Sequence, residues 1–304
     1  MVMSETRLAI KVDVDTDRGT RVGVPRLLDL FDEFGVKATF LFSLGPDNTG
    51  RAIRRIFRPG FFRKVARTSI VSTYGLRTLL NGVLWPGPHI GRRNEAVLRA
   101  ARDRGHEVGI HCYDHIRWQD GLVRMSRAEV YAEFDKARRE FERVYGEPAQ
   151  TAGAAGWQAN ALSLAAYDDA DLLYASDTRG THVFFPRVNG IVFRTLQIPT
   201  TLPTLDELLG RPEHPEERLV EQYLSWLRPG QLNVLTAHAE IEGMIKIDLF
   251  RALLAQAQKR GVRFVRLDDL ASEYLRERDR IPAGELIQGE VDGRSGTLAV
   301  QKAA

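Results

Sequence analysis

The chain has 304 residues, of which 43% are hydrophobic and 27% are charged, and its formal net charge is +3 at pH 7. A chain of this length and composition can bury a full core, which excludes the fibrous and wholly disordered classes. We expect a cytoplasmic protein without disulfides or spanning helices, because the chain has one cysteine, no apolar signal segment and no run of about 18 apolar residues.

Short apolar runs alternate with amphipathic helical patterns along the chain. The predicted strands are residues 8–14, 36–43, 107–112, 150–155, 172–177, 191–199, 232–238 and 262–267. Most of them lack strict in–out alternation, which is typical of strands buried on both faces. Helices are predicted over 24–34, ended by Gly35, from a capping box of Ser126 and Glu129 to Gly146, and over 251–261.

This alternation predicts a parallel α/β sheet with right-handed crossovers. Six polar residues stand at the carboxyl ends of predicted strands: Asp13, Asp15, His111, His115, Asp177 and His238. In an open sheet only the residues near the switch point would meet, whereas the strand ends of a barrel all converge on one mouth. We therefore expect a barrel over residues 1–278. The polar, glycine-rich residues 279–304 are expected to be disordered.

Asp13 and Asp15 share one face of the first predicted strand. Two neighbouring carboxylates stay ionised together at little cost only when a cation lies beside them. A metal ion bound by one of them would leave the other free to take a proton from water. The alternative is that these carboxylates cap the turn after the strand.

His111 and His115 follow another predicted strand in the pattern H-x-x-x-H. The chain must turn here for the two rings to meet, and both imidazoles can then reach one ion. With one aspartate they form an open ligand set that suits Zn²⁺, and Mn²⁺, Co²⁺, Ni²⁺ or Fe²⁺ would also fit. His238, at the end of a third strand, is a candidate general acid. The alternatives are hydrogen-bonded loop histidines and, for His238, a core histidine.

Further candidates surround these residues. Asp177 and Glu240 could orient the His238 ring or raise its pKa. Arg18 and Arg21, just beyond Asp15, could bind an anionic group such as a phosphate, or could form a solvated loop. One aromatic residue, Trp157 in the small-residue segment GAAGWQAN, could form a pocket wall or part of a tight junction.

A strongly basic segment lies between Asp47 and Glu95, where the chain has no acidic residue. Its ten basic residues are Arg51, Arg54, Arg55, Arg58, Arg63, Lys64, Arg67, Arg77, Arg92 and Arg93. Within residues 51–87 they mix with aromatic and aliphatic side chains, which is typical of segments that lie on an anionic membrane surface. We expect residues 48–92 to be such an insert. Nucleic acid is disfavoured as a partner because no recognised motif is present, and a dimer interface is the alternative.

Several stretches carry a resemblance to a known family: DVDTDRGTRVGVPRLL, FLFSLGPDNTGR, LLNGVLWPGPHIG, HEVGIHCYDHIRWQ, AAGWQA, YASDTRG, QIPTTLPT and LTAHAEIEG. On these stretches, which run from about residue 8 to about residue 270, the chain resembles the polysaccharide deacetylases with a NodB homology domain. Within that family it is most similar to the 4-deoxy-4-formamido-L-arabinose-phosphoundecaprenol deformylases of bacterial lipid A modification. The resemblance implies a metal-dependent amide hydrolase on a distorted (β/α)7 barrel.

The resemblance also implies roles for particular residues. These are metal binding by Asp15, His111 and His115, general base catalysis by Asp13, and general acid catalysis by His238 with support from Asp177. Gln158 departs from the pattern, because relatives often carry an arginine there, and Arg179 is a candidate to replace it.

The implied substrate is a formamido sugar linked to undecaprenyl phosphate at the inner face of the inner membrane. Two other functions remain open. One is a deacetylase of chitin-like or peptidoglycan sugars, which the lack of a secretory signal disfavours. The other is a non-catalytic, membrane-associated barrel that would need no metal ion.

Overall fold

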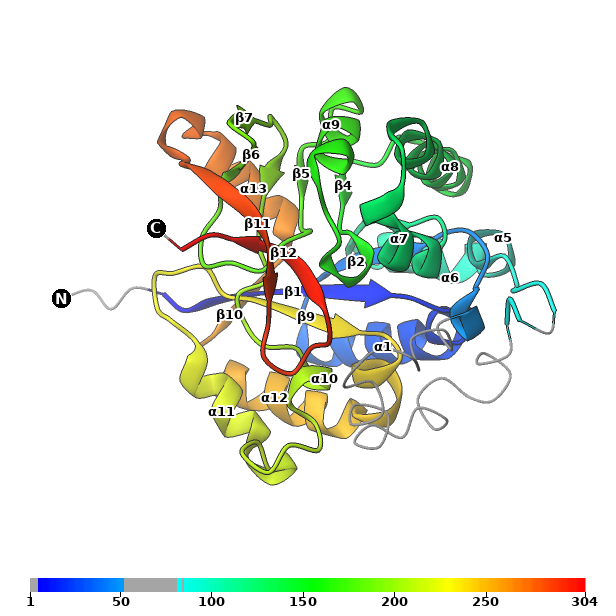
Figure 1. The fold of residues 1–304 in the computed structure, drawn as a ribbon. Helices are drawn as coiled ribbons and strands as arrows, with labels where there is room; N and C mark the ends of the chain where they lie inside the picture. The colour runs from blue at the N-terminus through cyan, green and yellow to red at the C-terminus, as the bar shows by residue number, and fades with distance from the viewer. Residues whose placement is uncertain (1–4, 52–80, 84, 304) are drawn as a thin grey trace.

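The computed structural model describes residues 5–51, 81–83 and 85–303. Within these residues, eight parallel strands form one curved sheet in the order β10-β1-β2-β3-β4-β5-β8, with β9 also paired to β1 (Figure 1). Its strands are β1 (Arg7–Val14), β2 (Thr39–Ser43), β3 (Glu107–Cys112), β4 (Thr151–Ala152), β5 (Tyr174–Ala175), β8 (Leu196–Gln197), β9 (Val234–His238) and β10 (Arg263–Val265).

The sheet bends far enough for its two ends to meet. The segment after β8 reaches β9, where the backbone N–H groups of Thr201 and Leu202 both donate to Val234 O at 3.1 Å. These bonds, together with the contact of 2.7 Å between the hydroxyls of Thr200 and Thr236, replace a regular ladder. The predicted distorted parallel barrel is therefore confirmed.

Helices cover the outside of this sheet (Figure 1). They are α1 (Val24–Phe34), α5 (Ile90–Arg93), α6 (Glu95–Asp103), α7 (His115–Gly121), α8 (Arg127–Tyr145), α9 (Ala161–Asp169), α10 (Leu205–Leu208), α11 (Leu219–Trp226), α12 (Ile247–Lys259) and α13 (Leu267–Leu275). The predicted ends of α1 and α8 are confirmed, since Gly35 and Gly146 are left-handed, with φ of 62° and 76°. Aromatic contacts join α1 to its neighbours. The ring of Phe31 in α1 lies 6.0 Å from that of Phe40 in β2 and 6.0 Å from that of Phe250 in α12, measured between centroids.

The expected disorder of residues 279–304 is wrong. This segment forms β11 (Ala283–Glu290) and β12 (Thr297–Gln301), which build a second sheet with β6 (Phe185–Val188) and β7 (Ile191–Val192). Leu286 and Ala299 are buried in a cluster with Ala159, Leu164 and Phe193. The few apolar residues of the tail therefore occupy positions where they are buried against the barrel. The average composition of the tail does not show this arrangement.

Candidate active site

The three predicted metal ligands lie together at the carboxyl ends of the parallel strands. Asp15 directly follows β1, His111 is the next-to-last residue of β3, and His115 is the first residue of α7. The Nε2 atoms of His111 and His115 lie 3.3 and 3.4 Å from Asp15 Oδ1. The two histidines do not share one helix. A short turn brings them together, because the Asp114 side chain caps α7 immediately after the strand.

The surroundings of these side chains fit a divalent cation. Nδ1–H of His111 donates to Gly153 O at 2.6 Å, which leaves the Nε2 lone pair facing Asp15. Asp15 Oδ1 is buried and accepts a hydrogen bond from neither imidazole. Burial raises the pKa of Asp15, but the two imidazoles outweigh this effect and hold that pKa below its usual value. One carboxylate oxygen and two ring nitrogens, oriented but not hydrogen-bonded to one another, form a ligand set for an ion such as Zn²⁺.

Asp13 and His238 lie directly opposite each other in the ladder between β1 and β9. Asp13 Oδ1 is also 3.9 Å from His111 Nδ1, so it lies beside the ligand set. Within the described part of the chain, Asp13 Oδ1 and His238 Nδ1 are buried atoms without a hydrogen-bond partner. Buried polar atoms are rarely left unpaired in folded proteins, so these two are available to a substrate or to water.

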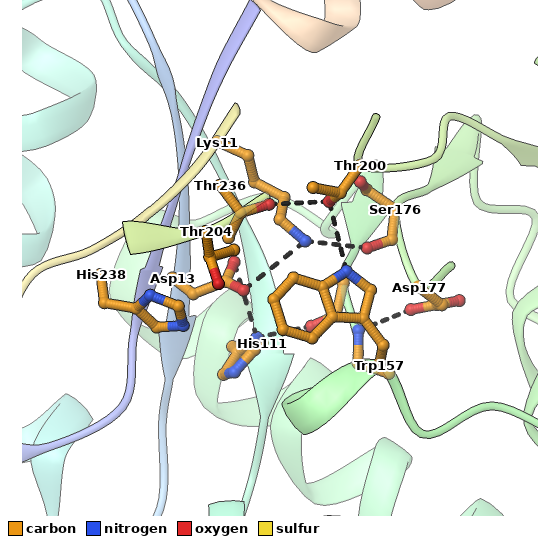
Figure 2. A network of polar contacts seen from close by, with 12 residues as sticks. Lys11, Asp13, His111, Trp157, Ser176, Asp177, Thr200, Thr204, Thr236 and His238 are labelled. Atoms are coloured by element: carbon orange, nitrogen blue, oxygen red, sulfur yellow. Dashed lines mark hydrogen bonds and ion pairs between the residues drawn. The ribbon is translucent and has the colours of Figure 1, made fainter. Parts of the chain in front are cut away.

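A buried lysine that the sequence analysis did not single out lies next to Asp13 inside the barrel (Figure 2). Lys11 Nζ is 3.5 Å from Asp13 Oδ2 and donates to Ser176 O at 3.0 Å. Burial lowers the pKa of Lys11, whereas the charges of Asp13 and Asp177 raise it. Lys11 precedes Asp13 by two positions and therefore points to the same face of β1. The spacing K-x-D-x-D was the signal that could have revealed it.

Glu240 holds the turn that carries Asp15. Its Oε1 accepts hydrogen bonds from the backbone N–H groups of Asp15 and Thr16 and from the Thr16 hydroxyl, at 3.2, 2.9 and 2.7 Å. A Cβ atom on Gly19 would lie 1.9 Å from the same oxygen, so any other residue there would displace the Glu240 carboxylate from these bonds. Burial and the charge of Asp15 raise the pKa of Glu240 to about 8. Glu240 Oε2 is buried without a partner among the described residues, which leaves it available to a ligand.

Trp157 forms a wall beside His238, with ring centroids 6.3 Å apart. Gly156 and Trp157 both adopt left-handed backbone conformations, with φ of 61° and 53°. A left-handed tryptophan is strained and persists only where its surroundings hold it. Here Nε1–H donates to the Thr200 hydroxyl at 3.2 Å, and the side chain is buried.

In the structure, the side chains of Asp177, Gln158 and Arg179 contact residues other than Asp13 and His238. Asp177 accepts hydrogen bonds from Ala154 N–H at 2.5 Å and from the Gln197 amide at 3.1 Å. Gln158 donates to Thr297 O at 2.7 Å, and Arg179 pairs with a carboxylate of α10. Among the described residues, no hydrogen bond or ion pair joins Asp177 to His238, or joins Gln158 or Arg179 to Asp13. Lys11 is instead the cation that contacts Asp13.

Arg18 and Arg21 lie on the π-helical turn η1 (Gly19–Gly23) or directly before it. Arg21 is 56% exposed and lies 4.0 Å from Asp17, which also pairs with Arg93 at 3.7 Å. A further cation comes from the tail, because the Arg294 guanidinium lies 4.4 Å above the Trp157 ring. No sequence signal pointed to Arg294, since the tail was expected to be disordered.

Most of the basic insert, residues 52–80 and 84, lies outside the described residues. Its two ends are joined beside the site, because Gly50 N–H donates to Asn81 O at 3.0 Å. Asp47 Oδ2 accepts hydrogen bonds from Asn81 Nδ2 at 3.3 Å and from the backbone N–H of Asp17 at 3.0 Å, so it links the insert to the turn that follows Asp15. In the part of the chain that the structure describes, no helix is long and apolar enough to cross a membrane.

A parallel α/β barrel with an aspartate and two histidines at its mouth, flanked by a second aspartate and a third histidine, defines the class of metal-dependent hydrolases. Residues 9–175 match the model of the family described as polysaccharide deacetylase. The chain belongs to the polysaccharide deacetylase family.

Two curated relatives extend the similarity to nearly the whole chain. A protein of Shewanella sediminis named "Probable 4-deoxy-4-formamido-L-arabinose-phosphoundecaprenol deformylase ArnD" is 38% identical, over 97% of this chain and 95% of the relative. A protein with the same name from Wigglesworthia glossinidia brevipalpis is 33% identical, over 93% of this chain and 98% of the relative.

Solved structures agree on the fold. A Mycobacterium smegmatis protein described as a polysaccharide deacetylase has a TM-score of 0.63 and 18% identity, covering 94% of this chain and 96% of that one. A Pseudomonas aeruginosa protein described in the same way has a TM-score of 0.58 and 17% identity, covering 90% and 92%. At these identities the likeness concerns the fold alone.

Proposed function

We propose that this protein hydrolyses the formyl amide of 4-deoxy-4-formamido-L-arabinose-phosphoundecaprenol, releasing formate and the aminoarabinose lipid used to modify lipid A. The observation that carries the proposal is the grouping of Asp15, His111 and His115 beside Asp13 and His238, each of the last two with a buried unpaired atom. The substrate follows from the names of the two relatives that match more than nine-tenths of the chain.

Asp15, His111 and His115 would hold one divalent cation, with Zn²⁺ preferred, and this ion would polarise the amide carbonyl and lower the pKa of water. Asp13 takes the proton of the attacking water through Oδ1, while Lys11 holds Oδ2. Protonated His238 gives a proton to the sugar nitrogen as the C–N bond breaks, because an amine leaves poorly without one. Formate and the free amine are the balanced products.

The remaining contacts would select the sugar. Glu240 Oε2, which has no partner among the described residues, would accept from a sugar hydroxyl. Trp157 would form the wall beside His238, with the Arg179 guanidinium 5.5 Å from its ring, while Gln158 would hold the neighbouring segment through Thr297 O. Arg18 and Arg21 would lie near the phosphate of the substrate. Asp177 would support the site without contacting the substrate, because its hydrogen-bond partners are Ala154 and Gln197.

The lipid chain of the substrate would bring the protein to the inner face of the inner membrane. Residues 51–87 carry the basic and apolar side chains that suit this surface. The segment starts close to Asp47, which is hydrogen-bonded to the turn that carries Asp15. Each basic group near an anionic surface contributes on the order of 1 kcal/mol. Reversible docking would therefore need only some of the segment's arginines.

A formate-release assay tests this function. The purified protein is mixed with the formylated lipid-linked sugar in detergent, with and without a chelator, and with an acetylated chitin oligomer as the competing substrate. We expect formate from the first substrate, its loss with the chelator and its return on adding Zn²⁺. Acetate release from the oligomer without formate release would instead support an N-deacetylase of polymeric sugars, and no product from either would support a non-catalytic barrel.

A further inference from the structure

The hairpin of β11 and β12 lies against the barrel mouth and brings an arginine into it. The turn between the two strands runs beside α10 (Figure 1). Gly293 packs so closely there that a Cβ atom would lie 2.5 Å from Glu207 O, and its φ of 82° also requires glycine. This close approach places the next residue, Arg294, over the indole ring of Trp157 at 4.4 Å.

Several bonds outside the mouth hold this hairpin. Arg211 Nη2 donates to Asp292 Oδ2 at 2.7 Å on one side of the turn, and Gln158 Nε2 donates to Thr297 O at 2.7 Å on the other. Farther away, Gln288 Nε2 donates to Ala159 O at 2.9 Å. Arg294 is therefore not needed to attach the hairpin.

The Arg294 guanidinium is largely buried but poorly satisfied. Its side chain is 12% exposed, and its one hydrogen bond with a described residue, from Nη1 to Glu207 Oε1, is long at 3.4 Å. Asp206 Oδ2 lies 3.8 Å away. Nε and Nη2 make no hydrogen bond with any residue that the structure describes, although a guanidinium carries five donors. Donors of this kind are costly to leave unused in a partly dry site.

The carboxylate nearest to Arg294, that of Glu207, is shared with a second arginine. Glu207 Oε1 lies 2.5 Å from Arg179 Nη1 and 3.4 Å from Arg294, so the closer arginine takes most of the interaction with this carboxylate. Burial lowers the pKa of Arg294, but the charges of Asp206, Glu207 and Asp15 outweigh this effect and raise that pKa.

We propose that Arg294 binds the phosphodiester of the substrate, an inference that rests on the proposed function. In the proposed function, the amide of that substrate would lie at Asp15, His111 and His115. The anionic phosphodiester would then remain for the guanidinium of Arg294, which is nearer to the Trp157 ring than the cations of Lys11 and Arg179. Arg21 is 56% exposed and is screened by water, whereas Arg294 is 12% exposed and interacts more strongly with an anion. Arg294 is thus a substrate-binding residue supplied by the tail.

Two substrates separate this role from a structural one. The first is the formamido sugar on a short, water-soluble prenyl phosphodiester, which needs no membrane, and the second is its neutral methyl glycoside. Arg294→Gln should raise the KM for the phosphodiester about tenfold or more relative to its effect on the glycoside, as expected for loss of a charge-assisted hydrogen bond. Arg294→Lys should recover part of this preference, and Arg211→Gln, which loosens the same hairpin outside the mouth, should leave it unchanged.

An equal loss on both substrates, or a preference lost in Arg21→Gln but kept in Arg294→Gln, would overturn the proposal. Calorimetric binding of the prenyl phosphodiester to the full chain and to Arg294→Gln gives a readout that does not need turnover. If the unaltered protein releases no formate, the proposed function fails. The role of Arg294 is then decided by calorimetry alone: it is supported if Arg294→Gln binds the phosphodiester at least tenfold more weakly than the unaltered protein, and refuted otherwise.

Discussion

Lys11 and Asp13 form a fully buried ion pair inside the barrel, with Nζ 3.5 Å from Oδ2. The pair lies on one face of β1, two residues before the first metal ligand (Figure 2). Because Lys11 engages Oδ2, the other carboxylate oxygen of Asp13 stays free and faces the site. The lysine therefore supplies, from the barrel interior, the cation that neither Gln158 nor Arg179 brings to this carboxylate.

Removing the lysine should destabilise the fold as well as the chemistry. Lys11→Met leaves the Asp13 carboxylate buried without its cation, which typically costs about 3–5 kcal/mol. Urea unfolding followed by circular dichroism measures this loss. The double variant Lys11→Met with Asp13→Asn should recover much of it, because the uncompensated charge is gone. A Lys11→Met protein within about 1 kcal/mol of the unaltered chain would contradict the ion pair's role.

Substitutions at two residues of the site should affect metal binding and turnover differently. His115→Ala removes a ligand of the proposed ion and should weaken Zn²⁺ binding about 100-fold or more, as titration calorimetry would show. Asp13→Asn keeps all three ligands, so it should bind Zn²⁺ nearly as well while turnover falls roughly 10²–10⁴-fold. Equal losses of Zn²⁺ affinity in the two variants would mean that Asp13 is itself a ligand.

Glu107 should make stability fall as the pH rises. The carboxyl accepts hydrogen bonds from the Thr39 and Tyr174 hydroxyls at the opposite end of the barrel. Burial and the charge of Asp268 raise the pKa of Glu107 from 4.5 to about 8. The folded protein then holds a proton that the unfolded chain has lost, so the free energy of unfolding decreases between about pH 4.5 and pH 8.

Unfolding curves recorded from pH 5 to pH 8 test this expectation. Glu107→Gln keeps a neutral polar group of the same shape and should make the decrease smaller. Glu240, whose pKa is also raised to about 8, should account for part of the decrease that remains. The exposed Glu217→Gln is the matched control, and it should preserve the slope seen in the unaltered protein. A slope that Glu107→Gln leaves unchanged would assign the whole pH dependence to other groups.

Replacing residues 52–80 by a short linker should weaken membrane binding without disturbing the barrel. The design is possible because Gly50 and Asn81 are already joined by a backbone hydrogen bond of 3.0 Å, so a short link can span the cut. We expect sedimentation with vesicles containing anionic lipid to fall about tenfold or more, since several basic groups are lost. Turnover of a water-soluble substrate should persist. Equal partitioning with and without the segment would refute the docking role.

Features that depend on local pattern could be predicted from the sequence alone. Apolar runs located the parallel strands, and polar residues placed at their carboxyl ends indicated that Asp13, Asp15, His111, His115 and His238 would meet. This worked because a parallel barrel brings every strand end to one mouth, whatever the lengths of the helices between. The same logic could have identified Lys11, which shares a strand face with Asp13.

Contacts between distant segments were decided only by the tertiary structure. The tail pairs β11 with β6 across nearly one hundred positions, Gln158 turns to Thr297, and Arg294 reaches the indole of Trp157. A sequence pattern reports which face of an element is apolar, but it does not say which remote surface that face will cover. Mean polarity therefore made the tail look disordered, although a few apolar side chains and its backbone hydrogen bonds hold it at the active site.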